Sequence, residues 1–385
     1  MIQYFATNRH MEKLGQAVEN RDRTLRHKMS EGGYYFVDMD IYMAFYMGTT
    51  DSSEMPRGAA IEDSSQVVFD KFLEDPRIGT IVVCVHGFNV ELFEAFTWFR
   101  ILTETMKHKP GLSEKIITSK ADLDCLVDAK AGSLTAFIGF SWPSDGSALK
   151  YPSDQKEAIG STAAFGGLLA RIRKTGKRLN LICHSMGNYV ACHTFKDLIN
   201  KVVIPPDVVG DKTLTPLLER KERAPGDGVE DVVGKDWFVD TFVMIAPDVE
   251  RRHVTKCKDP DQHHETLYVG PFYSGLQHLV RRKVNVYSRF DGALSISNIE
   301  KMPREAALSV ADTMNTVTFG LFKFLERNPD YHWEKRLGEA PAPMNAAPGF
   351  CSLNATELAG RKIDHSDHID APEIAWKIAE ELGIH

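Results

Sequence analysis

The sequence predicts an α/β fold with a doubly wound, mostly parallel sheet, and two observations lead to this prediction. Five short runs are almost wholly apolar and rich in β-branched residues, as in strands buried on both faces. They are residues 81–85, 135–140, 179–183, 241–246 and 284–287. Helical patterns separate these runs, and strands that alternate with helices are typical of a doubly wound sheet.

Two helices are predicted most clearly. Behind Ser185, an apolar face with helical spacing is formed by Ala191, Phe195, Leu198 and Ile199. The last helix carries Ile374, Ile378 and Leu382 with the same period. Asp370, with Glu373 three residues later, predicts the N-terminal cap of that helix.

The remaining segments surround the predicted sheet. In residues 1–78 we expect antiparallel or edge strands at 2–6 and 34–46, followed by a polar linker. Residues 205–237, 251–283 and 295–349 interrupt the strand–helix order and are rich in Pro, Gly, charges and aromatics. We interpret them as insertions over one end of the sheet, possible lid material, within a single domain that spans residues 1–385.

Composition excludes several classes of protein. The chain has 385 residues, of which 43% are hydrophobic, and a net charge of −7 without a long block of one sign. The basic stretch at residues 171–178 is typical of a solvated helix end, so we expect no nucleic-acid partner. The absence of a long apolar run, of a secretory signal and of a CxxC pair predicts a cytoplasmic protein without membrane insertion or disulfides.

The sequence LICHSMGN at residues 181–188 resembles the turn that exposes a nucleophilic serine between a strand and a helix, G-x-S-x-G. Cys183 stands where the pattern has its first glycine, and Gly187 supplies the second. Cysteine is small and apolar, so it remains compatible with a buried strand end. The structural alternative is that Ser185 only caps the following helix.

An earlier strand ends in HGFN at residues 86–89. Acyl transfer passes through a tetrahedral oxyanion that needs backbone N–H donors. A turn at this point can present the amide of Phe88, and the amide of Met186 offers the second donor. His86 is better explained as a structural group of the turn than as a base.

The base is expected near the C-terminus, in DHSDHIDAPE at residues 364–373. His365 is the first candidate and His368 the alternative. Their spacing could also suggest a metal pair, but no third ligand lies nearby in the sequence, and His263 with His264 forms only a weak candidate. We therefore expect no metal.

Two aspartates could orient the base, and both follow a predicted strand. Asp291 lies in RFDGAL after the strand at 284–287, and Asp248 lies in APDV after the strand at 241–246. Either could hold a histidine in the tautomer that general-base catalysis needs. Turn formation is the structural alternative for both.

Together these motifs resemble the α/β-hydrolase superfamily, from about residue 79 to the C-terminus. The closing stretch resembles the family's H-x-x-H-x-E-x-P-E, which implies His365 as the base, and the family's usual acid position implies Asp291. YFATNR at 4–9, GFSWPSDG at 139–146 and FDGALSIS at 290–297 resemble an uncharacterised bacterial branch of these hydrolases. Cys183 and Asp364 depart from the family's glycines.

The sequence thus predicts a serine-dependent carboxylic ester hydrolase that acts through an acyl-enzyme and needs no cofactor. The expected partner is a small-molecule ester, with Trp142 and Tyr273 as candidate walls of its pocket. The alternatives are a lipase or phospholipase that acts at an interface, and a binding protein with a degenerate site. The sequence does not indicate an oligomeric state.

Overall fold

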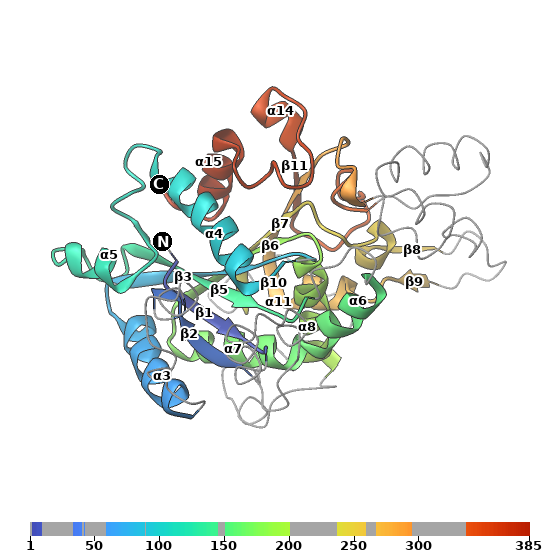
Figure 1. Ribbon diagram of the computed structural model, residues 1–385. Coiled ribbons are helices and arrows are strands. Elements are labelled where there is room, and N and C mark those ends of the chain that lie inside the picture. Colours follow the sequence, from blue (N-terminus) through green and yellow to red (C-terminus); the bar gives the residue numbers. More distant parts are fainter. Residues whose placement is uncertain are drawn as a thin grey trace, which may run out of the picture.

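The computed structural model describes residues 2–9, 34–40, 42, 59–88, 90–144, 151–200, 237–258, 267–294 and 336–385. Nine strands within these residues form the central sheet, in the order β11-β10-β7-β6-β3-β5-β1-β2 with β4 beside β5. Neighbouring strands run parallel except for β1 and β2. Helices lie on both faces of this sheet (Figure 1). The predicted doubly wound, mostly parallel α/β fold is confirmed.

The strands of the sheet are β1 (Tyr4–Thr7), β2 (Tyr35–Asp38), β3 (Ile78–Val85), β4 (Ile116–Ile117), β5 (Leu134–Ser141), β6 (Arg178–His184), β7 (Val239–Ile245), β10 (Val280–Tyr287) and β11 (Phe350–Asn354). A separate hairpin is formed by β8 (Lys256–Lys258) and β9 (Leu267–Val269). The helices are α3 (Ala59–Glu74), α4 (Leu92–Lys107), α5 (Lys120–Cys125), α6 (Tyr151–Gly160), α7 (Thr162–Lys174), α8 (Gly187–Asn200), α11 (Tyr273–Leu279), α14 (Ala355–Ala359) and α15 (Pro372–Glu381), with a short 3₁₀ turn, η6 (Arg251–Val254).

The sheet has an apolar core on each face. On one face, α4 and α15 pack through residues such as Phe96 and Ile374 against Val82 and Ile182. On the other face, α3, α7, α8 and α11 pack against the side chains that alternate with these along the strands. Figure 1 shows α4 and α15 together on one side and α7 and α8 on the other. Both faces of the sheet are therefore covered, and the carboxyl ends of its strands carry the loops described below.

The N-terminal segment differs from the prediction. β1 lies parallel to β5 inside the sheet, and only β2 is antiparallel and at the edge. Part of the expected linker is the helix α3. Strand pairing is set by partners far away in the sequence, so the local pattern at residues 2–6 could not distinguish the two directions.

The segment 251–283 is not an insertion throughout. Its last third forms α11 and the start of β10 within the central sheet. The sequence did not indicate the start of this strand because Arg281 and Arg282 are charged, and both are exposed. Lys283 is buried and donates from Nζ to the carbonyls of Leu276 and Val280. Hydrogen bonding to these carbonyls satisfies the polar end of a lysine inside a central strand.

The other two expected insertions lie largely outside the described residues. Residues 336–338 lie at the carboxyl ends of β7 and β10, where the Leu337 amide donates to Val249 and the Gly338 amide to Pro247, and the segment then runs back to the first half of β10, where Gly349 accepts from the Lys283 amide. The predicted cap of the last helix is wrong: α15 begins after Ala371 with Pro372, while Asp370 lies 3.7 Å from Arg361. Proline fixes the first-turn backbone without needing a side-chain cap. No helix in the described parts is long and apolar enough to cross a membrane.

Candidate active site

Ser185 occupies the sharp turn between β6 and α8, at the centre of the sheet. Its backbone has φ of +50°, one of two non-glycine residues with positive φ in the described chain. A side-chain-bearing residue adopts this conformation only where the surroundings impose it, and such strain is typical of a serine lifted above a strand end. The amide of Ser185 donates to the carbonyl of Ile245 (2.9 Å), which fixes the turn to β7.

Two glycines make room for this turn. A Cβ on Gly187 would lie 2.5 Å from the carbonyl oxygen of His86, and a Cβ on Gly87 would lie 2.8 Å from Cβ of Ser185. The end of β3 and the start of α8 therefore nearly touch. This proximity brings the HGF turn directly against the serine.

Cys183 fits the site without the glycine of the common pattern. Its side chain is wholly buried in the last part of β6, and burial raises the pKa of its thiol, so it behaves as a small apolar group. The turn is held instead by Asn188, whose side-chain amide donates to the carbonyls of Cys183 (3.1 Å) and Ser185 (2.9 Å). The buried side chain of Asn188 thus fixes the backbone of the turn at Cys183 and at Ser185.

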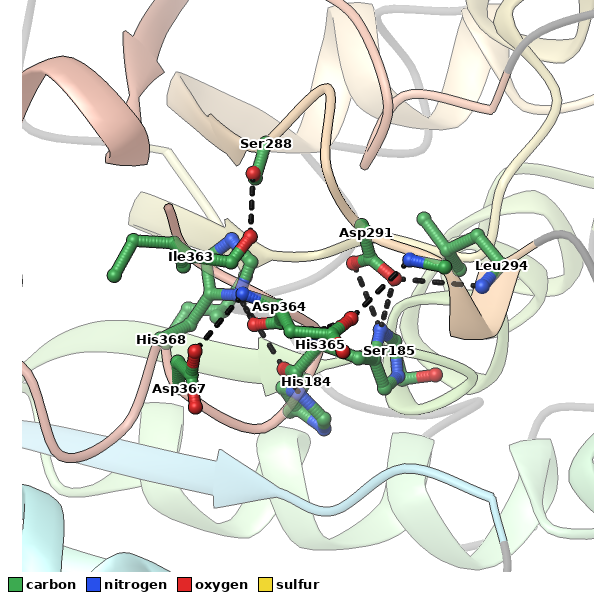
Figure 2. A network of polar contacts seen from close by, with 12 residues as sticks. His184, Ser185, Ser288, Asp291, Leu294, Ile363, Asp364, His365, Asp367 and His368 are labelled. Atoms are coloured by element: carbon green, nitrogen blue, oxygen red, sulfur yellow. Dashed lines mark hydrogen bonds and ion pairs between the residues drawn. The ribbon is translucent and has the colours of Figure 1, made fainter. Parts of the chain in front are cut away.

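The structure brings His365 and Asp291 together. Nδ1 of His365 lies 2.8 Å from Oδ2 and 3.0 Å from Oδ1 of Asp291. A carboxylate only accepts, so Nδ1 carries the proton and Nε2 keeps its lone pair. Figure 2 shows Ser185, His365 and Asp291 gathered in one cluster.

Burial and charge act in opposite directions on His365. Burial lowers the pKa of this imidazole, but the charge of Asp291 and the hydrogen bond to it outweigh burial and raise the pKa above 6.5. The carboxylate stabilises the imidazolium that forms when the base takes a proton.

Two neutral imidazoles hold the backbone of His365. Its carbonyl accepts from Nε2 of His184 (3.0 Å) and lies 3.3 Å from Nδ1 of His368, which is 3.0 Å from the carbonyl of Asp364. Burial lowers the pKa of both rings. His368, the alternative base, is fully buried and faces the backbone, so the structure gives it a supporting position.

Asp248, the alternative acid, has a different neighbour. Its carboxylate lies 3.5 Å from Nε of the buried Arg336, which is also 3.7 Å from Glu250. Its backbone amide donates to the carbonyl of Ser185 (3.3 Å). Asp248 therefore lies beside the nucleophile turn, and its charge contributes less than that of Asp291 to raising the pKa of His365.

Asp364, at a position where the resemblance to α/β-hydrolases implies a glycine, connects two loops. Its Oδ1 accepts from the amide of His365 (2.8 Å) and from that of Gly292 (3.2 Å), next to Asp291. The substitution thus links the base loop to the acid loop.

The candidate pocket residues have different surroundings. Trp142 is wholly buried, stacks on His86 at 5.4 Å and donates from Nε1 to the carbonyl of His86 (2.9 Å). It supports the turn and, in this structure, has no surface for a substrate, contrary to the expected pocket wall. Tyr273 begins α11 and is half-buried against the core. The two expected oxyanion donors both lie at the serine turn. Met186 is buried and follows Ser185 in the sequence, and Phe88 is half-buried and follows Gly87, which approaches Ser185 in space.

The described residues contain no group of three or more His, Cys, Asp or Glu that could hold a metal ion. His263 and His264 lie outside the described residues.

The sequence did not predict the supporting roles of His184 and Asn188, although both lie near Ser185 in the motif. The G-x-S-x-G pattern leaves the residue at position 184 open and ends before position 188, so the available signal was a polar side chain on each side of the turn.

Comparison with known proteins finds one family and one similar protein for this chain. The family described as alpha/beta hydrolase of unknown function (DUF900) matches residues 61–316. This range includes Ser185 and Asp291 but neither β1 nor His365. The chain is also similar to an uncharacterised protein of Nostoc sp. (strain PCC 7120), with 41% identity over 388 residues, 99% of this chain and 93% of the relative.

Proposed function

Because this chain belongs to the family of alpha/beta hydrolases of unknown function, we propose that it is a serine-dependent carboxylic ester hydrolase. The observation that supports this most strongly is the bond of Asp291 to Nδ1 of His365 beside a serine with φ of +50°. A serine that only capped α8 would need neither the strained backbone nor an oriented histidine.

In the proposed first half-reaction, Ser185 Oγ attacks the ester carbonyl carbon and Nε2 of His365 takes the hydroxyl proton. The negative oxygen of the tetrahedral intermediate accepts from the amides of Phe88 and Met186, near the N-terminus of α8. The imidazolium then gives its proton to the leaving alcohol, which departs and leaves an acyl-serine.

In the second half-reaction, water gives a proton to His365 and attacks the acyl carbon. The imidazolium returns that proton to Ser185 Oγ as the carboxylic acid leaves. Asp291 keeps Nδ1 protonated throughout, and no step requires a metal or an organic cofactor.

The test is hydrolysis of p-nitrophenyl esters from acetyl to palmitoyl by the wild type and by Ser185→Ala. The proposal predicts turnover that disappears in the variant, with a chain-length preference that describes the acyl pocket. A jump in rate above the critical micelle concentration would favour an interfacial lipase. Equal rates for both proteins, or none together with no labelling by a fluorophosphonate, would contradict the proposal.

A further inference from the structure

Three motifs meet behind the serine turn: TNR at residues 7–9, HGF at 86–88 and FSWP at 140–143. Of these, the proposed reaction uses only the Phe88 amide. They come together because β1 and β3 both pair with β5. Arg9, Ser141 and His86, here called the buried relay, are each exposed by 1% or less. A charged side chain at such a depth is costly unless its donors are used.

The proton positions in the buried relay follow from its contacts. Nε of Arg9 donates to Ser141 Oγ at 3.1 Å, because a guanidinium only donates. Nδ1 of His86 lies 2.8 Å from the carbonyl oxygen of Gly87, which only accepts, so Nδ1 carries a proton. Ser141 Oγ is 3.0 Å from Nε2 of His86 and donates its own proton there.

Burial, with the nearby charge of Arg9, supports this assignment. It lowers the pKa of His86 to about 3, so the ring is neutral and has one N–H. Burial also lowers the pKa of Arg9, to about 10, which leaves the guanidinium charged at neutral pH. The relay therefore runs in one direction, from the arginine to the carbonyl of Gly87.

The end of the relay is the peptide that would carry an oxyanion donor. The carbonyl of Gly87 and the N–H of Phe88 belong to one planar peptide unit, so a bond that fixes the carbonyl also fixes the direction of the N–H. Hydrogen bonds in series polarise one another, which makes that N–H a better donor. Nη2 of Arg9 also donates to the carbonyl of Val90 (2.9 Å), so the arginine holds both ends of the turn.

We propose that Arg9, Ser141 and His86 are positioning residues that orient the Phe88 amide toward the oxyanion of the reaction. This inference rests on the proposed ester hydrolysis. It assigns a function to β1, which lies beside β5 (Figure 1) and upstream of the residues that match the family. The N-terminal strand then completes the site rather than only extending the sheet.

The test compares Ser141→Ala with a matched control, Thr103→Val, which removes another fully buried hydroxyl in α4 that bonds only to helix carbonyls. With the best p-nitrophenyl ester, Ser141→Ala should lower kcat about 10- to 100-fold, a part of the 10²–10³ lost with a whole oxyanion donor, and leave KM unchanged. Inhibition by an alkyl trifluoromethyl ketone, which becomes an oxyanion on the serine, should weaken by the same factor. Thr103→Val should change neither quantity.

A second variant and a spectroscopic readout keep the test decisive. If Ser141→Ala does not fold, Arg9→Lys keeps the charge, removes the Nε donor and should give the same loss of kcat and of inhibitor affinity. ¹⁵N spectra of the wild type should show His86 as the neutral Nδ1–H tautomer from pH 5 to 9. An Nε2–H tautomer, or unchanged kcat and inhibitor affinity in the folded variants, would overturn the relay. Because these comparisons require a wild type that loses activity in Ser185→Ala, failure of the relay is distinct from failure of the proposed function.

Discussion

His365 and Asp291 lie 74 residues apart in the sequence, yet Nδ1 of the histidine is within 2.8 Å of one carboxylate oxygen and 3.0 Å of the other. The side chain of Asp291 is fully shielded from solvent, whereas 18% of that of His365 is exposed. The carboxylate is thus buried behind the imidazole, and part of the imidazole side chain remains exposed. This relationship is the basis of the first predictions.

Replacing Asp291 with Asn should lower kcat by about 10⁴, because an amide can bind the wrong tautomer and remove the lone pair from Nε2. Asp248→Asn is the matched control, because its carboxylate lies beside Arg336. Steady-state turnover of a p-nitrophenyl ester measures both. A large loss in Asp248→Asn without one in Asp291→Asn would assign the acid to Asp248.

The pH dependence of kcat/KM should follow the ionisation of His365 in the free enzyme. A base must be neutral, and Asp291 raises the pKa of this ring above 6.5, so activity should increase with pH through an apparent pKa above 6.5. Removing the charge in Asp291→Asn should move this acid limb to lower pH while the plateau falls. If the acid limb does not move in Asp291→Asn, the group that titrates in the pH profile is not the imidazole beside Asp291.

The two histidines of the C-terminal motif should respond differently to asparagine. An asparagine amide can replace the Nδ1–H of His368 toward the carbonyl of Asp364, so His368→Asn should retain most of the turnover. It cannot replace Nε2 as a base, so His365→Asn should lose on the order of 10⁴–10⁶ in kcat. Comparable losses in two folded variants, as judged by circular dichroism, would leave the base unassigned between them.

Gly87 should tolerate no side chain. A Cβ would lie 2.8 Å from Cβ of Ser185, so Gly87→Ala must displace the turn or the serine, and a shift of about 1 Å can cost roughly 10² in rate. Gly166→Ala in α7 is the control, because the added Cβ would lie 3.5 Å from its nearest neighbour, Thr194 of α8, and alanine favours a helix by about 0.5–1 kcal/mol. Turnover and thermal unfolding of both variants measure this. Full activity in Gly87→Ala would contradict the close approach of β3 to the serine.

The sequence predicted those parts of the fold that depend on local pattern. Four of the five apolar runs lie within β3, β5, β6 and β10, the run at 241–246 extends one residue beyond the end of β7, and the helix behind Ser185 is α8. What it could not predict depends on distant partners. β1 is parallel because β5 lies beside it, and β10 begins earlier because Lys283 reaches carbonyls of α11 and of its own strand.

The same distinction applies to the site. Ser185, His365 and Asp291 follow from motif and order, and the structure places the last two in contact. The buried position of Trp142 and of His368 depends on packing that no short pattern encodes. Arginine is mostly found at protein surfaces, so the sequence did not indicate that Arg9 is buried. The pairing of β1 with β5 explains its burial.

The central claim is that Ser185 is an activated nucleophile, and a fluorophosphonate tests this most directly because it phosphonylates only such serines. Labelled protein would be digested and the modified residue identified by mass spectrometry, with Ser185→Ala and Asp291→Asn treated in parallel. If Ser185 is an activated nucleophile, we expect one label per chain on Ser185, none at that site in Ser185→Ala, and much slower labelling in Asp291→Asn. A wild type that stays unlabelled, or a label that persists elsewhere in Ser185→Ala at the same rate, would contradict it.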